Sequence, residues 1–480
     1  MYKTHSSRQA TFEDFNQSCG MKLDPSNEWC LLAARIPWAK WEARYAALFP
    51  SGRGRPAIPL RIALGALIIQ KREHLSDRRL VRSIAENPYL QYFLGLPAFA
   101  SSAPFKPTVL VNFRKRLTAE FLQAVNEDIL ADAPSTPEHA SKPRGRKRAN
   151  PATLILDASC SPDEIRPPHD STLLEEARLA TEEAIDALHR QFPAEGHRPR
   201  TYRRVLRKAY LSFSRARKRP AGAAHDLCGK LLGALRRNLA FIDAFLAKGG
   251  TLDERTLARL DTIRQVYAQQ LEMHRTGHRS VPRRIVSLSK PWLRPIVRGK
   301  VRTPVEFGPK YEVSIDEKGH ARLEKLQFEA YNECHTLQTA AQRYHDRCDH
   351  WPKRILADQI YRTHDNRTWC EARGIHLSGR PPSRTPPTRA ERLAGRQEDA
   401  DRNEVERLFS RAKRTCGAGL LQLRLEPTTL AAVALSILVS NLFGVRWKLF
   451  FVFHLADIPD APPGLLAYPP ALLELHPPIF

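Results

Sequence analysis

TLILD (Thr153–Asp157) and RILAD (Arg354–Asp358) are the stretches that decide the fold. Each is a short apolar run that ends in an aspartate, and such runs are typical of strands buried in a sheet. In open α/β sheets, ligands bind at the carboxyl ends of the strands. We therefore predict an α/β fold whose sheet presents Asp157 and Asp358 at one site.

RNEVERLFSRAKRTC (Arg402–Cys416) adds a third carboxylate. On a helix, Arg402, Glu406 and Lys413 lie within about 40° of one another, along the edge of an apolar stripe. An ordinary amphipathic helix with an i,i+4 ion pair also gives this pattern. The two strand-end aspartates favour a shared site instead, and three carboxylates suit Mg²⁺ or Mn²⁺ rather than zinc. The stripe consists of Val405, Phe409, Ala412 and Cys416, with Leu408 on its flank.

Together these motifs resemble the DDE transposases of bacterial insertion sequences, whose glutamate lies in an Arg-x3-Glu-x6-Lys signature. Arg402, Glu406 and Lys413 match that spacing, while Asp399 stands where the full signature has a tyrosine. Other segments also resemble one branch of this family, and the resemblance extends to about residue 445. They are DASCSPDEIRPPHDSTLLEEAR from Asp157, RPIVRGK from Arg294, VEFG from Val305 and ADQIYRTHDNR from Ala357.

The resemblance implies an RNase H-like mixed sheet as catalytic core, with Asp157, Asp358 and Glu406 as catalytic residues and metal ligands. Two Mg²⁺ or Mn²⁺ ions about 4 Å apart would serve strand cleavage and strand transfer at insertion-sequence ends. Arg402 and Lys413 would bind DNA phosphates, and the protein would act as a homodimer on double-stranded DNA. Two alternatives stay open: a catalytically inactive, transposase-derived DNA-binding protein, and a structure-selective nuclease on the same core.

Composition favours a nucleic-acid partner. The 480 residues include 76 Lys and Arg against 51 Asp and Glu, a net charge of +25. An anionic membrane would also attract this charge, but no basic amphipathic anchor or lipidation signal is evident. The first residues lack an apolar core, so we expect no signal peptide. Eight cysteines without a CxxC pair indicate reduced thiols, and we expect a cytoplasmic, nucleoid-associated bacterial protein.

Residues 1–133 are expected to form a helical DNA-binding domain, followed by a basic linker over residues 134–150. Apolar periodicity and turn signals predict several short helices, one of which is capped by Ser76 and ended by Asn87–Pro88. Such helices with exposed arginines resemble a helix-turn-helix reader. The DNA-binding candidates are Arg114, Lys115 and Arg116; the alternative is a solvated basic face on a structural bundle.

A long helical interval, residues 172–280, is expected as an insertion between two parts of the catalytic core, residues 151–171 and 281–420. Its helices could instead form coiled-coil contacts to a second subunit. The segment that follows is strongly basic, and we expect Arg294, Arg298 and Lys300 to line a DNA channel. Trp292 is a candidate for stacking on an extruded base, with simple packing as the alternative.

The remaining stretches predict structure more than chemistry. Tyr311–Ile315 and Ala321–Phe328 alternate like the strands of a hairpin. Cys334–His350 reads as a helix whose Cys and His residues lack zinc-ligand spacing. Residues 421–456 hold an apolar helix, expected in the core rather than in a membrane, and residues 457–480 form a Pro-rich tail. Motifs of ATP-driven motors, zincins and serine hydrolases are absent from the sequence.

Overall fold

A computed structural model of the chain describes residues 22–49, 56–131, 152–193, 196–278, 280–297, 305–380 and 384–444. Its centre is a five-stranded sheet with the order β5-β4-β1-β6-β7. β4 runs antiparallel to both of its neighbours, whereas β1, β6 and β7 are parallel. The predicted α/β fold with a mixed sheet is confirmed. The strands are β1 (Thr153–Cys160), β4 (Lys310–Ile315), β5 (Ala321–Gln327), β6 (Arg354–Ala357) and β7 (His376–Leu377).

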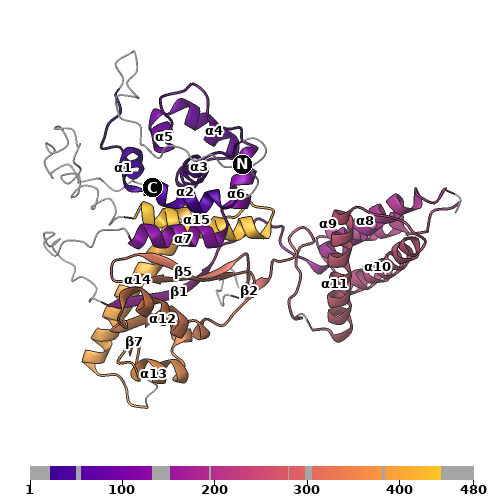
Figure 1. Cartoon of the computed structure of the whole chain (residues 1–480). Coiled ribbons are helices and arrows are strands. Elements are labelled where there is room, and N and C mark those ends of the chain that lie inside the picture. Colours follow the sequence, from indigo (N-terminus) through magenta and orange to yellow (C-terminus); the bar gives the residue numbers. More distant parts are fainter. Residues whose placement is uncertain are drawn as a thin grey trace.

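Helices cover both faces of this sheet (Figure 1). α14 and α15 pack on one face, where Ile155 of β1 belongs to the buried cluster. α12 and α13 cover the other face, around Leu154 and Leu156. Side chains alternate along a strand, so Asp157 shares the face of Ile155 and points toward α14. The bounds are α12 (Leu337–Cys348), α13 (His364–Glu371), α14 (Arg389–Thr415) and α15 (Glu426–Leu442).

Seven helices precede the sheet in the described N-terminal part, and their ends follow local capping rules. The Ser76 side chain accepts a hydrogen bond from the backbone N–H of Arg79, so it caps α4 as predicted. Asn87 ends α4 and caps α5, which starts at Pro88. The helices are α1 (Glu28–Arg35), α2 (Trp38–Ala46), α3 (Leu60–Arg72), α4 (Asp77–Glu86), α5 (Pro88–Phe93), α6 (Val109–Arg116) and α7 (Ala119–Ala131).

α15 belongs to two cores at once. Leu435 and Leu438 pack among the N-terminal helices, whereas Val433 and Ile437 pack on the sheet. Burial on both sides explains why its sequence is apolar all round. Across the described residues, no helix is long and apolar enough to span a membrane. The N-terminal helices and the sheet are therefore joined through one shared helix.

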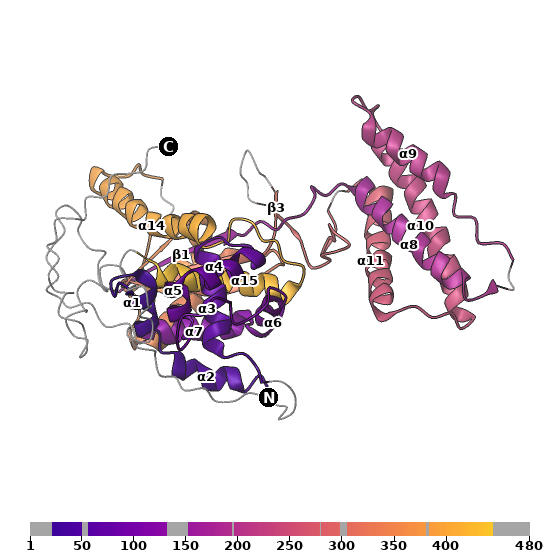
Figure 2. The same cartoon turned by 90° about the horizontal axis from the view of Figure 1, so that it is seen from above.

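The chain leaves the sheet after β1 and returns before β4. Between these points, four helices form a bundle with its own apolar core, set apart from the sheet (Figures 1 and 2). Returning from the bundle, the chain forms the small ribbon of β2 (Pro295–Val297) and β3 (Val305–Phe307). The helices are α8 (Asp170–His189), α9 (Arg203–Arg215), α10 (Ala223–Ala247) and α11 (Glu254–Thr276).

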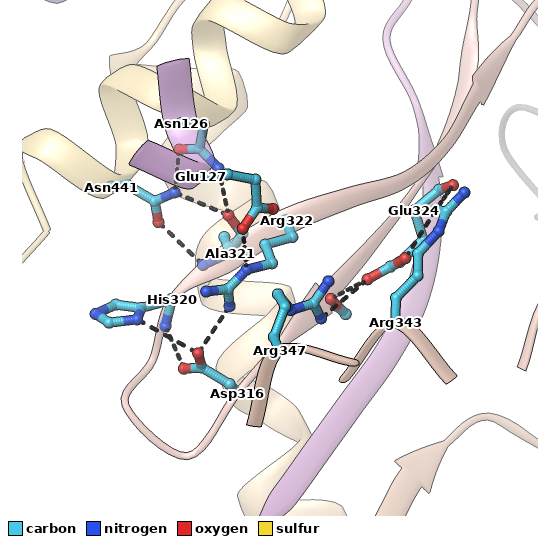
Figure 3. Close-up of polar contacts among 11 residues, drawn as sticks. Asn126, Glu127, Asp316, His320, Ala321, Arg322, Glu324, Arg343, Arg347 and Asn441 are labelled. Atoms are coloured by element: carbon cyan, nitrogen blue, oxygen red, sulfur yellow. Dashed lines mark hydrogen bonds and ion pairs between the residues drawn. The ribbon is translucent and has the colours of Figure 1, made fainter. Parts of the chain in front are cut away.

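The outer strand β5 is held to the helices by a buried junction of amides (Figure 3). Asn441 of α15 accepts a hydrogen bond from the Ala321 N–H (3.0 Å) and donates to the Ala321 carbonyl (2.8 Å). Asn126 of α7 donates to the same carbonyl and accepts from Asn441. Beside them, Arg322 bridges Asp316 and Glu127. One point of the sheet edge thus connects α7, α15 and β5.

Candidate active site

The pairing of β1 with β6 bears on the two predicted aspartates. The strands are parallel and Leu156 lies opposite Ala357, which is the last residue of β6. Asp157 follows Leu156 within β1, whereas Asp358 follows the end of β6. Neighbouring strands lie about 4.8 Å apart. Ala357 faces α12 and α13, so continued alternation would direct Asp358 toward the face of α14. The register therefore favours close approach of two of the three predicted acids.

α14 lies across the parallel half of the sheet and carries the third acid. Thr388 and Glu391 form a capping box at its first turn. Two contacts then hold it to the starts of β6 and β7: an ion pair of Asp401 with Arg354 at 2.7 Å, and a hydrogen bond between Glu398 and His376 at 2.6 Å. The predicted apolar stripe is buried. Val405, Leu408, Phe409 and Ala412 pack on the sheet, whereas Cys416 lies in the core of the N-terminal helices.

Arg402 is the residue of α14 that reaches Asp157. Its Nη1 donates to Asp157 Oδ2 at 3.1 Å, while Asp157 Oδ1 accepts from the Ala158 N–H at 2.8 Å. The pKa of Asp157 is raised to about 6, mainly by burial and to a lesser extent by the carboxylates of Glu406 and Glu333. The Ala158 N–H and Arg402 act in the opposite direction. The site therefore concentrates negative charge around one buried carboxylate.

The other two acids lie at the surface of the site. The Asp358 side chain is exposed and caps the turn η4 (Gln359–Tyr361) through the Gln359 N–H. Glu406 is also exposed. Among the residues that the structure describes, no three His, Cys, Asp or Glu side chains are close enough to hold a metal ion.

The donor chemistry nevertheless fits a divalent cation. Asp157 and Asp358 are neighbours by register, and Glu406 is close enough to raise the pKa of Asp157. Exposed side chains change rotamer within nanoseconds, so Asp358 and Glu406 can turn toward a cation beside Asp157. Oxygen ligands with excess negative charge are what Mg²⁺ and Mn²⁺ prefer.

Glu404 and Lys413 complete the polar part of α14. Glu404 lies about 200° round the helix from Glu406. Burial lowers the pKa of Arg411, and the Glu404 carboxylate partly opposes this effect. Lys413 follows Glu406 by two turns on nearly the same side and is half-buried. Two glutamates separated by one residue thus face different surroundings.

A buried carboxylate, Glu312, supports the site from the opposite face of the sheet and was missed by sequence reasoning. It lies on β4 and accepts hydrogen bonds from the Tyr361 hydroxyl (2.9 Å) and the Thr336 hydroxyl (2.5 Å). Burial raises its pKa to about 7. Tyr361 ends the turn that Asp358 begins, so this contact fixes the position of that turn. The available signal was a glutamate within the otherwise strand-like KYEVSI.

Glu333 was missed as well. It lies in the turn η3 (Glu333–His335) and forms an ion pair with Lys310 at 2.7 Å. Its carboxylate raises the pKa of both Asp157 and Glu312. Its only sequence signal is the Asn332 cap that precedes it.

The segments from Asp157 and from Val305, quoted above for their resemblance to the family, lie where the chain passes between the sheet and the helical bundle. Asp163, in the motif that starts at Asp157, makes a buried ion pair with Lys290. The Asp163 N–H donates to the Phe307 carbonyl at 2.8 Å. The glycine of VEFG is required here, because a Cβ on Gly308 would lie 1.9 Å from the Ser161 carbonyl oxygen. These motifs therefore fix the backbone next to the candidate site.

The N-terminal DNA-binding candidates differ in their surroundings. Arg114 is half-buried; it forms an ion pair with Asp77 and donates to Gln70 at 2.8 Å. These contacts fasten α6 to α3 and α4. Lys115 and Arg116 are exposed, and the Arg116 guanidinium lies 4.7 Å from the centre of the Phe49 ring. The expectation that all three cations are exposed is therefore wrong for Arg114.

The structure describes only some of the DNA-binding candidates in the basic segment that follows the helical bundle. Arg294 is half-buried, donates to the Leu293 carbonyl at 3.0 Å and pairs with Glu329 at 3.4 Å. Trp292 is half-buried, and its ring lies edge-on to Phe328. Arg298, Lys300, the linker over residues 134–150 and the tail over residues 457–480 lie outside the described residues.

Comparisons with known proteins identify the two main segments of the chain. Residues 17–116 match a family described as Transposase domain (DUF772). Residues 355–443 match a family described as Transposase DDE domain. An uncharacterized protein of Rhizobium meliloti, ORF8 in the nfe locus, is 28% identical over 151 residues, which are 32% of this chain and 69% of that protein. No solved structure matches the chain significantly.

A sheet that presents two neighbouring aspartates to a glutamate-bearing helix is the arrangement expected of the DDE class. The DDE match contains Asp358, Arg402, Glu406 and Lys413, whereas Asp157 lies before it. Two segments of the chain therefore match transposase domain families, one at its N-terminal helices and one over the second half of the sheet and α14.

Proposed function

We propose that the protein binds the ends of an insertion sequence and carries out divalent-metal-dependent DNA strand cleavage and strand transfer. The observation that carries this proposal is the hydrogen bond from Arg402 of α14 to Asp157, beside the parallel pairing of β1 with β6 that leads to Asp358. In this proposal the five-stranded sheet is an RNase H-like catalytic core. The match to a Transposase DDE domain supports DNA as the substrate.

Asp157, Asp358 and Glu406 would hold the metal ions. Two bound Mg²⁺ or Mn²⁺ ions would supply Lewis-acid activation of the scissile phosphate and its attacking oxygen. Relief of the charge crowding that raises the pKa of Asp157 would favour cation binding at this point. Glu312 and Tyr361 would keep the Asp358 turn in place during the reaction.

Arg402 and Lys413 would bind the phosphates that flank the scissile bond. Arg402 already lies within hydrogen-bond distance of Asp157, so a phosphate bound at Arg402 would lie next to the acids. We further propose that two subunits act together on paired DNA ends. This homodimer is inferred from the family and not from a described surface.

A strand-cleavage assay with matched glutamate variants tests the proposal. The substrate is a duplex that carries one end of the element encoding the protein together with its flanking DNA, with Mg²⁺ or Mn²⁺ added. Glu406→Gln should lower the cleavage rate at saturating DNA by about 100-fold or more, as expected when a group that stabilises transition-state charge is lost. Glu404→Gln, on the other side of the same helix, should stay within about threefold of wild type.

DNA binding separates the proposal from its main alternative. A gel shift should show that Asp157→Asn and Glu406→Gln still bind the duplex, because both changes spare the cations. Wild-type protein that binds this duplex but cleaves it with neither metal would instead indicate a catalytically inactive DNA-binding protein. Equal loss of cleavage in the two glutamate variants would remove the assigned role of Glu406.

A further inference from the structure

The helical bundle carries a basic face that the candidate active site does not use. Between His197 and Gly222, the sequence holds ten Arg or Lys and no Asp or Glu. Four of these cations lie on α9 and are exposed; we name them the α9 stripe. The α9 stripe consists of Arg204, Arg207, Lys208 and Arg215. At 100° per residue, its members span about 100° of the helix surface and about 16 Å of its length.

α9 is mounted rigidly on the bundle by its opposite face. Leu206 is buried there, and Tyr210 and Phe213 pack against the core of the bundle. The Tyr210 hydroxyl lies 3.4 Å from that of Thr172 on α8. At the start of the helix, Arg203 pairs with Asp186 at 3.0 Å. The α9 stripe therefore lies on the face of the helix opposite these core contacts.

The charge of the α9 stripe is not balanced within the described part of the chain. No ion pair there involves any of its four members, although Arg203 beside them pairs with two acids of α8. α11 differs, since Arg264 pairs with Asp243 and Arg259 with Glu183. Like charges at this density repel one another unless an anionic partner approaches. A polyanion matches the face better than an apolar partner.

We propose that the α9 stripe binds the phosphate backbone of duplex DNA, at a point apart from the candidate active site. This inference rests on the proposed function, because DNA is the polyanion that a transposase handles. A stripe of about 16 Å covers roughly five base-pair steps along one strand. Contacts of this kind carry no sequence information, so the bundle holds DNA without reading it.

The test measures binding of the full-length protein to a 40-base-pair duplex of random sequence at several salt concentrations. Replacing the four stripe residues by Ala removes up to four phosphate contacts. The slope of log affinity against log salt should fall by up to about 3.6, with about eightfold weaker binding per lost contact at 0.1 M salt. The pair Lys208→Ala and Arg215→Ala should give about half the effect, and it serves if the fourfold variant folds poorly.

A matched control removes the same charge from α11, through Ala at Arg255, Arg259, Arg264 and Arg275. A variant with lysine in place of Arg204, Arg207 and Arg215 should bind DNA like wild type, because it keeps the charge of the α9 stripe. Equal losses in the stripe and control variants would show a net-charge effect and overturn the proposal. Unchanged DNA binding by the stripe variant would also overturn the proposal. If this variant then sedimented as a smaller species than wild type in analytical ultracentrifugation, the α9 stripe would be assigned to contact with a second subunit. Wild-type protein that binds no DNA would overturn the proposed function together with this inference.

Discussion

Asn441→Leu tests how strongly the buried amide junction holds the sheet edge to the helices. Leu keeps the approximate size of Asn but removes both polar groups. The Ala321 N–H and the Asn126 side-chain oxygen then lose their partners, while the Ala321 carbonyl keeps the Asn126 amide. All three residues are buried, at 1–5% exposure. Each orphaned group costs about 1–3 kcal/mol.

The apolar Leu side chain returns about 1 kcal/mol through burial. The expected loss in free energy of unfolding is therefore about 1–5 kcal/mol, with about 3 kcal/mol as the central value. Urea unfolding followed by tryptophan fluorescence measures it, because Trp29, Trp38 and Trp41 are buried in the core shared with α15. Hydrogen exchange of the Ala321–Gln327 peptide should show faster opening of β5.

Glu127→Gln is the matched control in the same junction (Figure 3). Its ion pair with Arg322 lies at the rim, since the Glu127 side chain is 44% exposed, and Arg322 retains Asp316. Exposed ion pairs contribute about 1 kcal/mol or less. An Asn441→Leu protein no less stable than Glu127→Gln, with normal protection of β5, would refute the reasoning.

Three further changes have definite expected outcomes. Burial lowers the pKa of Lys71 from 10.5 to about 8, so the free energy of unfolding should rise as the pH increases from about 8 to 10.5. Urea titrations should show no such rise in Lys71→Met. The pKa of Glu312 is raised from 4.5 to about 7, so the stability of the wild type should fall as pH increases across that interval. Thermal melts at several pH values should show no such fall in Glu312→Gln. Arg114→Ala should lower the free energy of unfolding by about 1–3 kcal/mol. Ala at both Lys115 and Arg116 should lower it by only about 1 kcal/mol, through loss of the Arg116 contact with Phe49, and should reduce the salt slope of DNA binding by up to about 2.

Local patterns in the sequence predicted the elements well. The end of β6 just before Asp358, the Ser76 cap and the break at Pro88 all depend on residues within a few positions of one another. The predicted end of the first strand at Asp157 is wrong, because pairing with β4 extends β1 to Cys160. The buried stripe of α14 follows from its periodicity alone. Such features are predictable because the interactions that create them are local.

Features that depend on distant partners were not predictable. Arg114 resembles any exposed cation of a basic helix until Asp77 is placed beside it by the packing of α6 on α4. Glu312 and Glu333 affect the site only through the pairing of β4 with β1 and the turn before α12. The sharing of α15 by two cores likewise depends on tertiary packing rather than on its own periodicity.

Arg354 links both strands of the candidate site to α14. It begins β6 and reaches two partners: it donates to the Thr153 hydroxyl on β1 at 2.9 Å and to Asp401 on α14 at 2.7 Å. A slip of one residue between β1 and β6 would turn the side chains of β6 to the other face. The pairing of Arg354 with Thr153 at the strand starts opposes that slip. Asp401, the second partner of Arg354, directly precedes Arg402, which bonds Asp157. One side chain at the start of β6 thus contributes both to the strand register and to the position of α14.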